Sequence, residues 1–414
     1  MTTSAHEAVP PREGERLRSN RDFMVVLGGQ AVSAVGDAIT LTAMPLLVLF
    51  LTGSGALMGT VAALGLLPNL LLGLPAGALA DRWDRRKLML WSDAGRAVLT
   101  AAIPVSYWLD LSTITVVLIV TVPINALRVF SDVAFQSSIP GLVGRENLAR
   151  ANSYVESALT VPFIVGPALA GVLVATVGAA ETIALDAASF ALSAVSLLFV
   201  RRALRAERPA EMPRISADIV EGIRFVRGHA LLRVAIAYWS LMMFATAAIL
   251  PALAYFLTVD RDEGAELFGV VGSVWSVGYL VGSLLAGRLG GRTLGLQLLA
   301  GGAGVGLALL LLASTSSVAA YLVAGFAVGA ALALQMIAYM TLRASVTPDE
   351  LLGRVGATTR TVSLSLQTLG FLAGGALIEA TDGGDALLAM GVLALGASLA
   401  FSLSRSLRTS SQPA

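Results

Sequence analysis

Cysteine is absent from this chain of 414 residues, and histidine occurs only twice, as His6 and His229. The lack of cysteine excludes disulfides, thiolate metal sites, iron–sulfur clusters and cysteine nucleophiles. Both histidines fall in polar segments, so we expect no histidine metal site and no histidine proton relay within a membrane. We therefore expect neither a metal nor a cofactor.

Lysine is also scarce, because Lys87 is the only lysine among the 28 basic residues. No glycine precedes it, so the chain lacks the GK[ST] loop that binds phosphates in ATP-driven pumps. An ATP-driven pump is therefore excluded. Separately, we expect a protein that is not an enzyme and does not bind nucleic acid.

Charged residues make up only 13 % of the chain, against roughly 25 % in soluble proteins. Hydrophobic residues make up 56 %, and the mean hydropathy is +0.80. This composition excludes a soluble multidomain enzyme. A membrane barrel is disfavoured because barrel strands alternate in short segments. A helical span needs about 20 apolar residues, which leaves room for about twelve spans.

Apolar runs of span length occur twelve times, in two groups of six on either side of a basic, proline-containing stretch. The predicted spans are 24–50, 56–78, 88–108, 113–137, 154–177, 182–200, 233–257, 267–289, 294–313, 317–341, 360–380 and 385–404. The corresponding domains are a tail (1–22), a six-helix bundle (23–201), a linker (202–232), a second six-helix bundle (233–405) and a tail (406–414). We expect no cleaved signal peptide, because residues 1–21 are not followed by a short apolar region with a cleavage site.

The basic residues indicate the orientation. Of the 28, 25 fall at the two ends, in the linker and at the even-numbered junctions, whereas the opposite junctions hold only Arg261. Positively charged loops stay in the cytoplasm. We therefore expect a multi-pass protein of the cell membrane with both termini cytoplasmic.

The two halves of the chain repeat each other. AGALADR, which ends at Arg82, matches AGRLGGR, which ends at Arg292, and GPALAG (166–171) matches GFLAGG (370–375). Parallel repeats of this kind are expected to surround a site near the membrane midplane. Between the halves, ISADIVEGIRFVRG (215–228) has apolar residues at helical spacing, which predicts an interfacial helix. The alternative is a solvated linker.

Charged residues inside the spans are costly, at about 2.5–3.5 kcal/mol each on insertion scales. They gather in the first half, while the second half has essentially no acid in a span core and Glu379 falls at an outer end. The residues concerned are Asp37, Asp93, Arg96, Arg128, Asp132 and Asp186. Such groups persist when they pair, face water or take part in function.

Asp37 lies about 21 Å into its helix, past the middle of the hydrocarbon. Burial disfavours the charged form of a carboxylate, which makes Asp37 a candidate proton carrier. Alternatively, Arg128 or polar neighbours such as Gln30 neutralise it. Arg128 itself lies deep enough to contact substrate or a carboxylate.

The other intramembrane charges have local explanations. Arg128 and Asp132 have the i, i+4 spacing of a helical ion pair, and Asp93 and Arg96 have the i, i+3 spacing. We interpret Asp93, Arg96 and Asp132 as structural pairs, and the alternative is that they form a conformational switch together with the loop at 77–87. Ser189 could satisfy Asp186 locally.

Two short motifs involve glycine or a cluster of charges. The loop GALADRWDRRK (77–87) contains Gly77, Asp81, Arg82, Arg85 and Arg86, and is either a conformational element or only a topology signal. In GPALAG, Gly166 and Gly171 permit close helix contact and Pro167 removes an amide donor. As a bare pattern, this second motif is common in membrane helices.

Aromatic and methionine side chains gather in the second half. Together with polar residues they form a candidate substrate cavity: Gln30, Asp37, Arg128, Tyr238, Met242, Met243, Trp275, Tyr279, Gln335 and Tyr339. Flexible methionines and broad rings suit varied apolar ligands. The alternative is that individual members face lipid or only fill the core.

Over nearly its whole length the sequence resembles the major facilitator superfamily. GALADRWDRRK looks like that family's signature loop, although Asp84 stands where a glycine is usual, and GPALAG resembles the helix-5 motif of exporting antiporters, although Pro162 replaces its leading glycine. The macrolide-efflux and siderophore-exporter-like branch is more similar still. Three stretches carry this likeness: GGQAVSAVGDAITLTAMPLLVLFLTGSG (28–55), IPGLVGRENLARANS (139–153) and DIVEGIRFVRGHALLR (218–233).

The resemblance implies a secondary transporter that exports small amphipathic molecules, such as drugs, antibiotics or siderophore-like metabolites, by proton antiport and alternating access. Helices 1, 4, 7 and 10 would line the cavity. Asp81 would cap helix 11 in the outward-open state, and Arg85 could reach Asp132. We expect protons, the substrate and the bilayer as partners of a monomer. The alternatives are a proton-coupled uptake symporter and a non-transporting membrane receptor.

Overall fold

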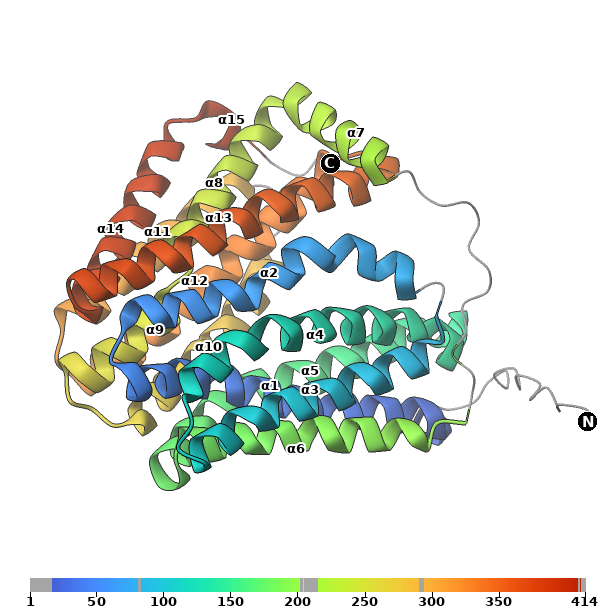
Figure 1. The fold of residues 1–414 in the computed structure, drawn as a ribbon. Helices are drawn as coiled ribbons and strands as arrows, with labels where there is room; N and C mark the ends of the chain where they lie inside the picture. Colours follow the sequence, from blue (N-terminus) through green and yellow to red (C-terminus); the bar gives the residue numbers. More distant parts are fainter. Residues whose placement is uncertain are drawn as a thin grey trace, which may run out of the picture. The chain divides into compact units, whose positions relative to one another are not determined.

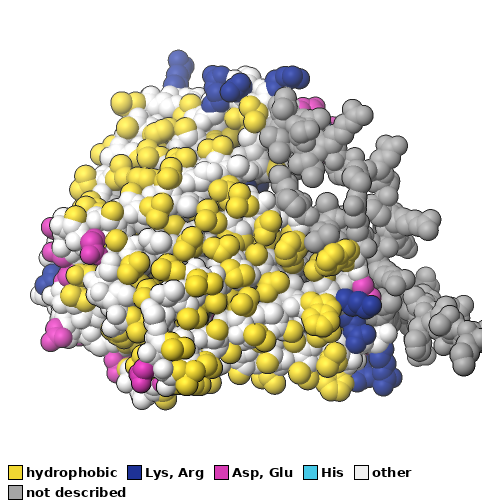
Figure 2. Space-filling view, in the orientation of Figure 1, with side chains coloured by type: hydrophobic (Ala, Val, Ile, Leu, Met, Phe, Trp, Pro, Cys, Tyr) yellow, Lys and Arg dark blue, Asp and Glu magenta, His cyan; other side chains and the backbone are white. Residues whose placement is uncertain are grey.

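The structure, a computed structural model, describes residues 17–80, 83–201, 204, 215–289, 294–408 and 410. These residues form helices joined by short turns (Figure 1), and no strand occurs among them. Hydrophobic side chains cover much of the face seen in Figure 2. Large apolar side chains such as Leu71, Trp91 and Val98 are 66–72 % exposed, which is typical of a surface that faces lipid.

Six long helices precede the linker: α1 (Arg21–Thr52), α2 (Gly55–Ala80), α3 (Arg85–Trp108), α4 (Thr113–Val143), α5 (Leu148–Val177) and α6 (Ala179–Leu198). The linker contains α7 (Ile215–Gly228). The second half consists of α8 (Ala230–Thr246), α9 (Ile249–Tyr255), the π-helical turn η3 (Phe256–Asp260), α10 (Ala265–Leu289), α11 (Leu294–Ser314), α12 (Val318–Ser345), α13 (Leu352–Ala380), α14 (Gly383–Ser402) and the short α15 (Arg405–Arg408). Single 3₁₀ turns precede α1, α5 and α13: η1 (Leu17–Ser19), η2 (Arg145–Asn147) and η5 (Asp349–Leu351).

Most of these helices are long and apolar enough to span a bilayer. Among the described residues, 11 spans meet both conditions, and α8, α9 and η3 together count as one of them. The remaining predicted span, α3, is 24 residues long but more polar, since it contains Asp93 and Arg96 and begins with three basic residues. The long apolar runs of the sequence are therefore helical, as predicted.

The seventh span differs from the continuous helix predicted over 233–257. It breaks after Thr246 and resumes at Ile249 as α9. Pro251 explains the break, because proline has no N–H to donate to the carbonyl of Ala247, four residues earlier. The π-helical turn then carries the chain to Asp260.

The predicted linker helix is present with the predicted bounds. Glu221 of α7 forms an ion pair with Arg354 of α13. Gly222 lies against the same helix, where an added Cβ would meet the carbonyl oxygen of Arg354 at 2.7 Å. These contacts attach α7 to the first turn of α13.

Contacts divide the chain into two units. The first contains Met1–Thr40, Leu71–Gly166 and Ala180–Met212, and its described part has an apolar core that includes Phe23, Met89 and Phe135. The second contains Leu41–Leu70, Pro167–Ala179 and Pro213–Ala414, with a core that includes Trp239, Leu298 and Tyr339. The division into bundles at 23–201 and 233–405 stays a prediction.

Within the second unit, the start of α2 lies directly against α13. A Cβ added to Gly375 would lie 2.8 Å from the Cα atom of Gly59, so the two backbones touch. Near the end of α13, the carboxylate of Glu379 accepts hydrogen bonds from Ser54 Oγ at 2.8 Å and from the Ala56 N–H at 3.2 Å. Glu379 thus caps the N-terminus of α2, where the helix dipole favours negative charge.

A larger side chain at Gly375 is expected to destabilise the protein. Gly375→Leu would force α2 and α13 apart, at a cost of about 1–3 kcal/mol for overpacking. Gly396→Leu in α14 is the matched control, because an added Cβ there meets nothing within 4 Å. Melting of the purified protein in detergent should show a lower transition temperature for Gly375→Leu. The transition temperature of the control should equal that of the wild type. Equal melting of the two variants would contradict this close contact.

Candidate functional site

A cluster of charged side chains lies in the first unit, inside the membrane-spanning helices. Four helices contribute to it, and each contributes at least one aspartate. Its members are Asp37 of α1, Asp93 and Arg96 of α3, Arg128 and Asp132 of α4, and Asp186 of α6. We call these six residues the charge cluster.

Asp37 lies between the two arginines of the cluster. Its Oδ1 atom is 2.6 Å from Arg96 Nη2 and 3.6 Å from Arg128 Nη1. The side chain of Arg96 is only 3 % exposed, and its guanidinium lies 3.8 Å above the ring centroid of Phe190. A cation held by both an aspartate and an aromatic face is well compensated for its burial.

Asp93 is completely buried and is stabilised mainly by neutral donors. Ser193 Oγ donates to it at 2.7 Å, Ser131 Oγ at 2.9 Å and Gln30 Nε2 at 3.5 Å. The predicted Asp93–Arg96 pair exists only as a long contact of 3.9 Å. Arg96 is therefore chiefly the partner of Asp37, because its long side chain reaches across to α1.

Asp186 is 2 % exposed and is in contact with α1. Its Oδ2 accepts a hydrogen bond from Thr40 Oγ1 at 2.6 Å, and Ser189 Oγ donates to its Oδ1 at 3.2 Å. Gly36 makes room for this carboxyl group, since an added Cβ would lie 2.2 Å from Asp186 Oδ1. The spacing within α6 indicates only the local contact with Ser189, whereas the contact with Thr40 depends on how α6 packs against α1.

Arg128 and Asp132 form the more open side of the charge cluster. Arg128 Nε lies 3.8 Å from Asp132 Oδ2, as the i, i+4 spacing predicts. Their side chains are 36 % and 56 % exposed, against 17 % for Asp37. Asp37 can thus be approached from the side of Arg128, whereas Asp93 and Asp186 are enclosed.

The charge cluster contains more acids than bases. Its four aspartates face two arginines, so full ionisation would leave an excess of two negative charges, shared between the enclosed Asp93 and Asp186 and the more open Asp37 and Asp132. Within the described ranges, no three or more His, Cys, Asp or Glu side chains are placed to hold a metal ion.

The loop after α2 is only partly described. Asp81 and Arg82 lie outside the described residues, and Gly77 belongs to α2. Asp84, the departure from the family pattern, is the N-cap of α3 with φ −67°, so no glycine-specific turn is needed there.

The two arginines after Asp84 bind carbonyl oxygens within the first unit. Arg85 Nη1 donates to the carbonyl of Ser137 at 2.6 Å. Arg86 Nε donates to that of Leu197 at 2.8 Å. Because Leu197 stands at the end of α6, Arg86 stabilises the carbonyl end of that helix.

The GPALAG motif brings α5 close to two other helices. In the first unit, a Cβ on Gly166 would lie 2.6 Å from the Cβ of Ala38, the neighbour of Asp37. In the second unit, a Cβ on Gly171 would lie 2.9 Å from the Cα of Gly269 in α10, and Pro167 contacts the same helix at Gly272. The motif is thus used for close packing, as its glycines predict.

The candidate cavity residues of the second half fall into two groups. Tyr238, Met242, Gln335 and Tyr339 are at most 1 % exposed, and Tyr339 stacks on Trp239 with ring centroids 4.5 Å apart. The hydroxyl of Tyr238 is 2.8 Å from Ser398 Oγ. Met243 and Trp275 are half-buried, and Tyr279 is exposed, with its hydroxyl 3.1 Å from Met336 Sδ. Their role as a substrate cavity stays a prediction.

The sequence of the chain matches a known family over most of its length. The model of the Major Facilitator Superfamily matches residues 26–362. The chain belongs to this superfamily. The Major Facilitator Superfamily fold predicted from the sequence is thereby confirmed, and the protein is a multi-pass membrane transporter.

Two curated members of the superfamily are similar in sequence. The chain is 32 % identical over 277 residues to the Multidrug efflux pump Tap of Mycolicibacterium fortuitum, and this match covers 63 % of the chain and 66 % of the pump. It is 28 % identical over 274 residues to Macrolide efflux protein A of Streptococcus pyogenes, and this match covers 65 % of the chain and 66 % of that protein. Each match thus spans just under two thirds of the relative's length.

A solved superfamily member has the same fold. A crystal structure of a mutant of the nucleoside transporter NupG superposes with a TM-score of 0.76 at 14 % identity, and covers 94 % of this chain and 99 % of that one. At this identity the likeness concerns the fold alone.

Proposed function

We propose that the protein exports small amphipathic molecules, such as drugs, antibiotics or siderophore-like metabolites, in exchange for protons by alternating access. Support for export comes from the similarity to a multidrug efflux pump and a macrolide efflux protein. The skew of Lys and Arg supports cytoplasmic termini in the cell membrane. The proposed transporter works as a monomer, without a cofactor.

The observation that carries proton coupling is the position of Asp37. Its carboxylate touches Arg96 and Arg128, is 17 % exposed, and belongs to a cluster in which acids outnumber bases. A proton on Asp37 would break its ion pair with Arg96 and leave both guanidinium groups to the remaining carboxylates. Protonated and ionised Asp37 would therefore favour different arrangements of the cluster.

Proton binding drives transport only if the two conformations hold the proton with different affinity. A proton would enter Asp37 when the cluster is open to the outside and leave when it is open to the cytoplasm. Substrate and proton would thus move in opposite directions. Arg128, which is 36 % exposed and contacts Asp37, is the residue best placed to sense substrate and proton together.

The exporter hypothesis is tested by flux in everted membrane vesicles that contain the protein. An imposed pH gradient, acidic inside, should drive accumulation of a substrate that is first identified by drug-susceptibility and siderophore-export panels in a deletion strain. Collapse of the gradient with a protonophore should stop the accumulation. Substrate flux in the same direction as the protons would identify an uptake symporter, and the absence of any flux would support a receptor.

A further inference from the structure

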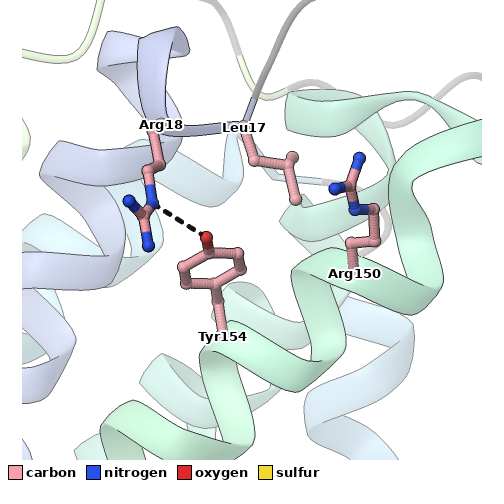
Figure 3. A pocket seen from close by; sticks show the side chains of 4 residues that line it. All are labelled: Leu17, Arg18, Arg150 and Tyr154. Atoms are coloured by element: carbon pink, nitrogen blue, oxygen red, sulfur yellow. Dashed lines mark hydrogen bonds between the residues drawn. The ribbon is translucent and has the colours of Figure 1, made fainter.

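A pocket of about 390 Å³ lies in the first unit, where η1 and the start of α5 meet. Leu17, Arg18, Arg150 and Tyr154 line it, and Figure 3 shows their side chains gathered around one hollow. Pockets that bind small ligands usually measure about 300–1,000 Å³. This one therefore has room for a small polar group. Its residues come from η1 and the start of α5, and none of them belongs to the charge cluster.

Hydrogen bonds hold the walls of the pocket in place. Asn20 Nδ2 donates to the carbonyl of Leu142 in α4 at 2.8 Å, and Asn20 Oδ1 caps α1 by accepting from the Phe23 N–H at 3.1 Å. Arg18 Nε donates to the Tyr154 hydroxyl at 3.1 Å (Figure 3). Leu17 is 6 % exposed and belongs to the apolar core. The short η1 turn is thus fixed to α4 and α5.

The chemistry of the pocket favours an anion. Two exposed arginines flank it, and neither forms an ion pair with any residue in the part of the chain that the structure describes. The Nε of Arg18 donates to Tyr154, and its two terminal amino groups have no hydrogen-bond partner among the described residues. Guanidinium groups bind phosphate oxygens through two parallel hydrogen bonds, and a pair of them would hold a phosphate from both sides.

The location of the pocket favours a lipid as the source of that phosphate. Arg18 precedes the first span by three residues, and Arg150 and Tyr154 stand in the first two turns of α5, so all three lie at the membrane surface. Tyrosine is enriched at this level of the bilayer, and basic pockets between helices bind anionic headgroups. Leu17 adds an apolar wall beside the charged groups.

We propose that this pocket binds the phosphate group of an anionic membrane lipid. The bound headgroup would link η1 to α5 through Arg18 and Arg150. This site is separate from the proposed transport site, and its occupancy does not depend on whether the protein moves protons.

Native mass spectrometry of the purified full-length protein tests the proposal. Phosphatidylglycerol should bind the wild type more tightly than phosphatidylcholine, and Arg18→Gln/Arg150→Gln should weaken phosphatidylglycerol binding roughly tenfold. Arg288→Gln/Arg408→Gln is the matched control, since both residues are exposed and removal of them changes the net charge equally. The control should bind phosphatidylglycerol as the wild type does.

A second variant and a second ligand make the test decisive. Tyr154→Phe keeps both charges and removes only the hydroxyl that orients Arg18, so it should weaken binding by about two- to fivefold. Equal loss in the control pair, or no loss in either pocket variant, would overturn the site. Glycerol 3-phosphate that competes fully with the lipid at equal concentration would overturn the lipid source and identify a soluble phosphate ester instead.

Discussion

Asp37→Asn is expected to reduce pH-gradient-driven efflux to the level of membranes that lack the protein. Asparagine has the same shape as aspartate but neither ionises nor releases a proton. It would also leave Arg96, which is 3 % exposed, without the carboxylate that lies 2.6 Å away. Efflux in everted vesicles should be expressed per amount of folded protein in the membrane, because loss of the carboxylate beside Arg96 also lowers stability. Efflux should fall to background even on that basis.

Asp110→Asn provides the control for this experiment. Asp110 lies in the turn between α3 and α4, is exposed, and has a φ of 52°, which asparagine adopts as readily as aspartate. Its transport should equal that of the wild type. Undiminished proton-driven efflux by Asp37→Asn would remove Asp37 from the coupling mechanism while leaving the family assignment intact.

Arg96→Met is expected to be among the most destabilising single substitutions in the protein. Methionine fills a similar volume against Phe190, but it leaves Asp37 without its close cation and Asp93 without a nearby positive charge. Removal of one partner of a buried ion pair costs about 3–5 kcal/mol. The apparent melting temperature in detergent should fall steeply, and the yield of folded protein should fall with it.

The double variant Asp37→Asn/Arg96→Met separates charge from packing. Loss of both partners leaves no uncompensated charge at this pair, so much of the stability should return although transport stays absent. If the double variant melts as low as Arg96→Met, the guanidinium stabilises the fold through Phe190 and the surrounding helices instead of through Asp37.

Much of the fold was predictable because the relevant signals are local and repeated. An apolar run of about 20 residues has few alternatives to a spanning helix, and the periodic residues of 215–228 specify α7 with its observed bounds. The break in the seventh span was missed. Pro251 indicates that the helix is interrupted. The residues around it are all apolar, however, so the hydropathy pattern gives no sign that α8 ends at Thr246.

The membership of the charge cluster was also largely predictable, because ionisable residues in a span are few. Their partners were not. The spacing of Asp93 and Arg96 suggested a pair on one helix, yet Arg96 reaches Asp37 on another helix and Asp93 is satisfied by serines. Such choices depend on the rotation of each helix about its axis, which the spacing within one helix does not specify.

The absence of a side chain at Gly36 links two distant positions of the chain. The carboxyl group of Asp186 occupies the space that a methyl group on residue 36 would need, at 2.2 Å from its Oδ1. A substitution that enlarges residue 36 is therefore expected to require a shorter or reoriented side chain at residue 186, although the two positions lie 150 residues apart in the chain.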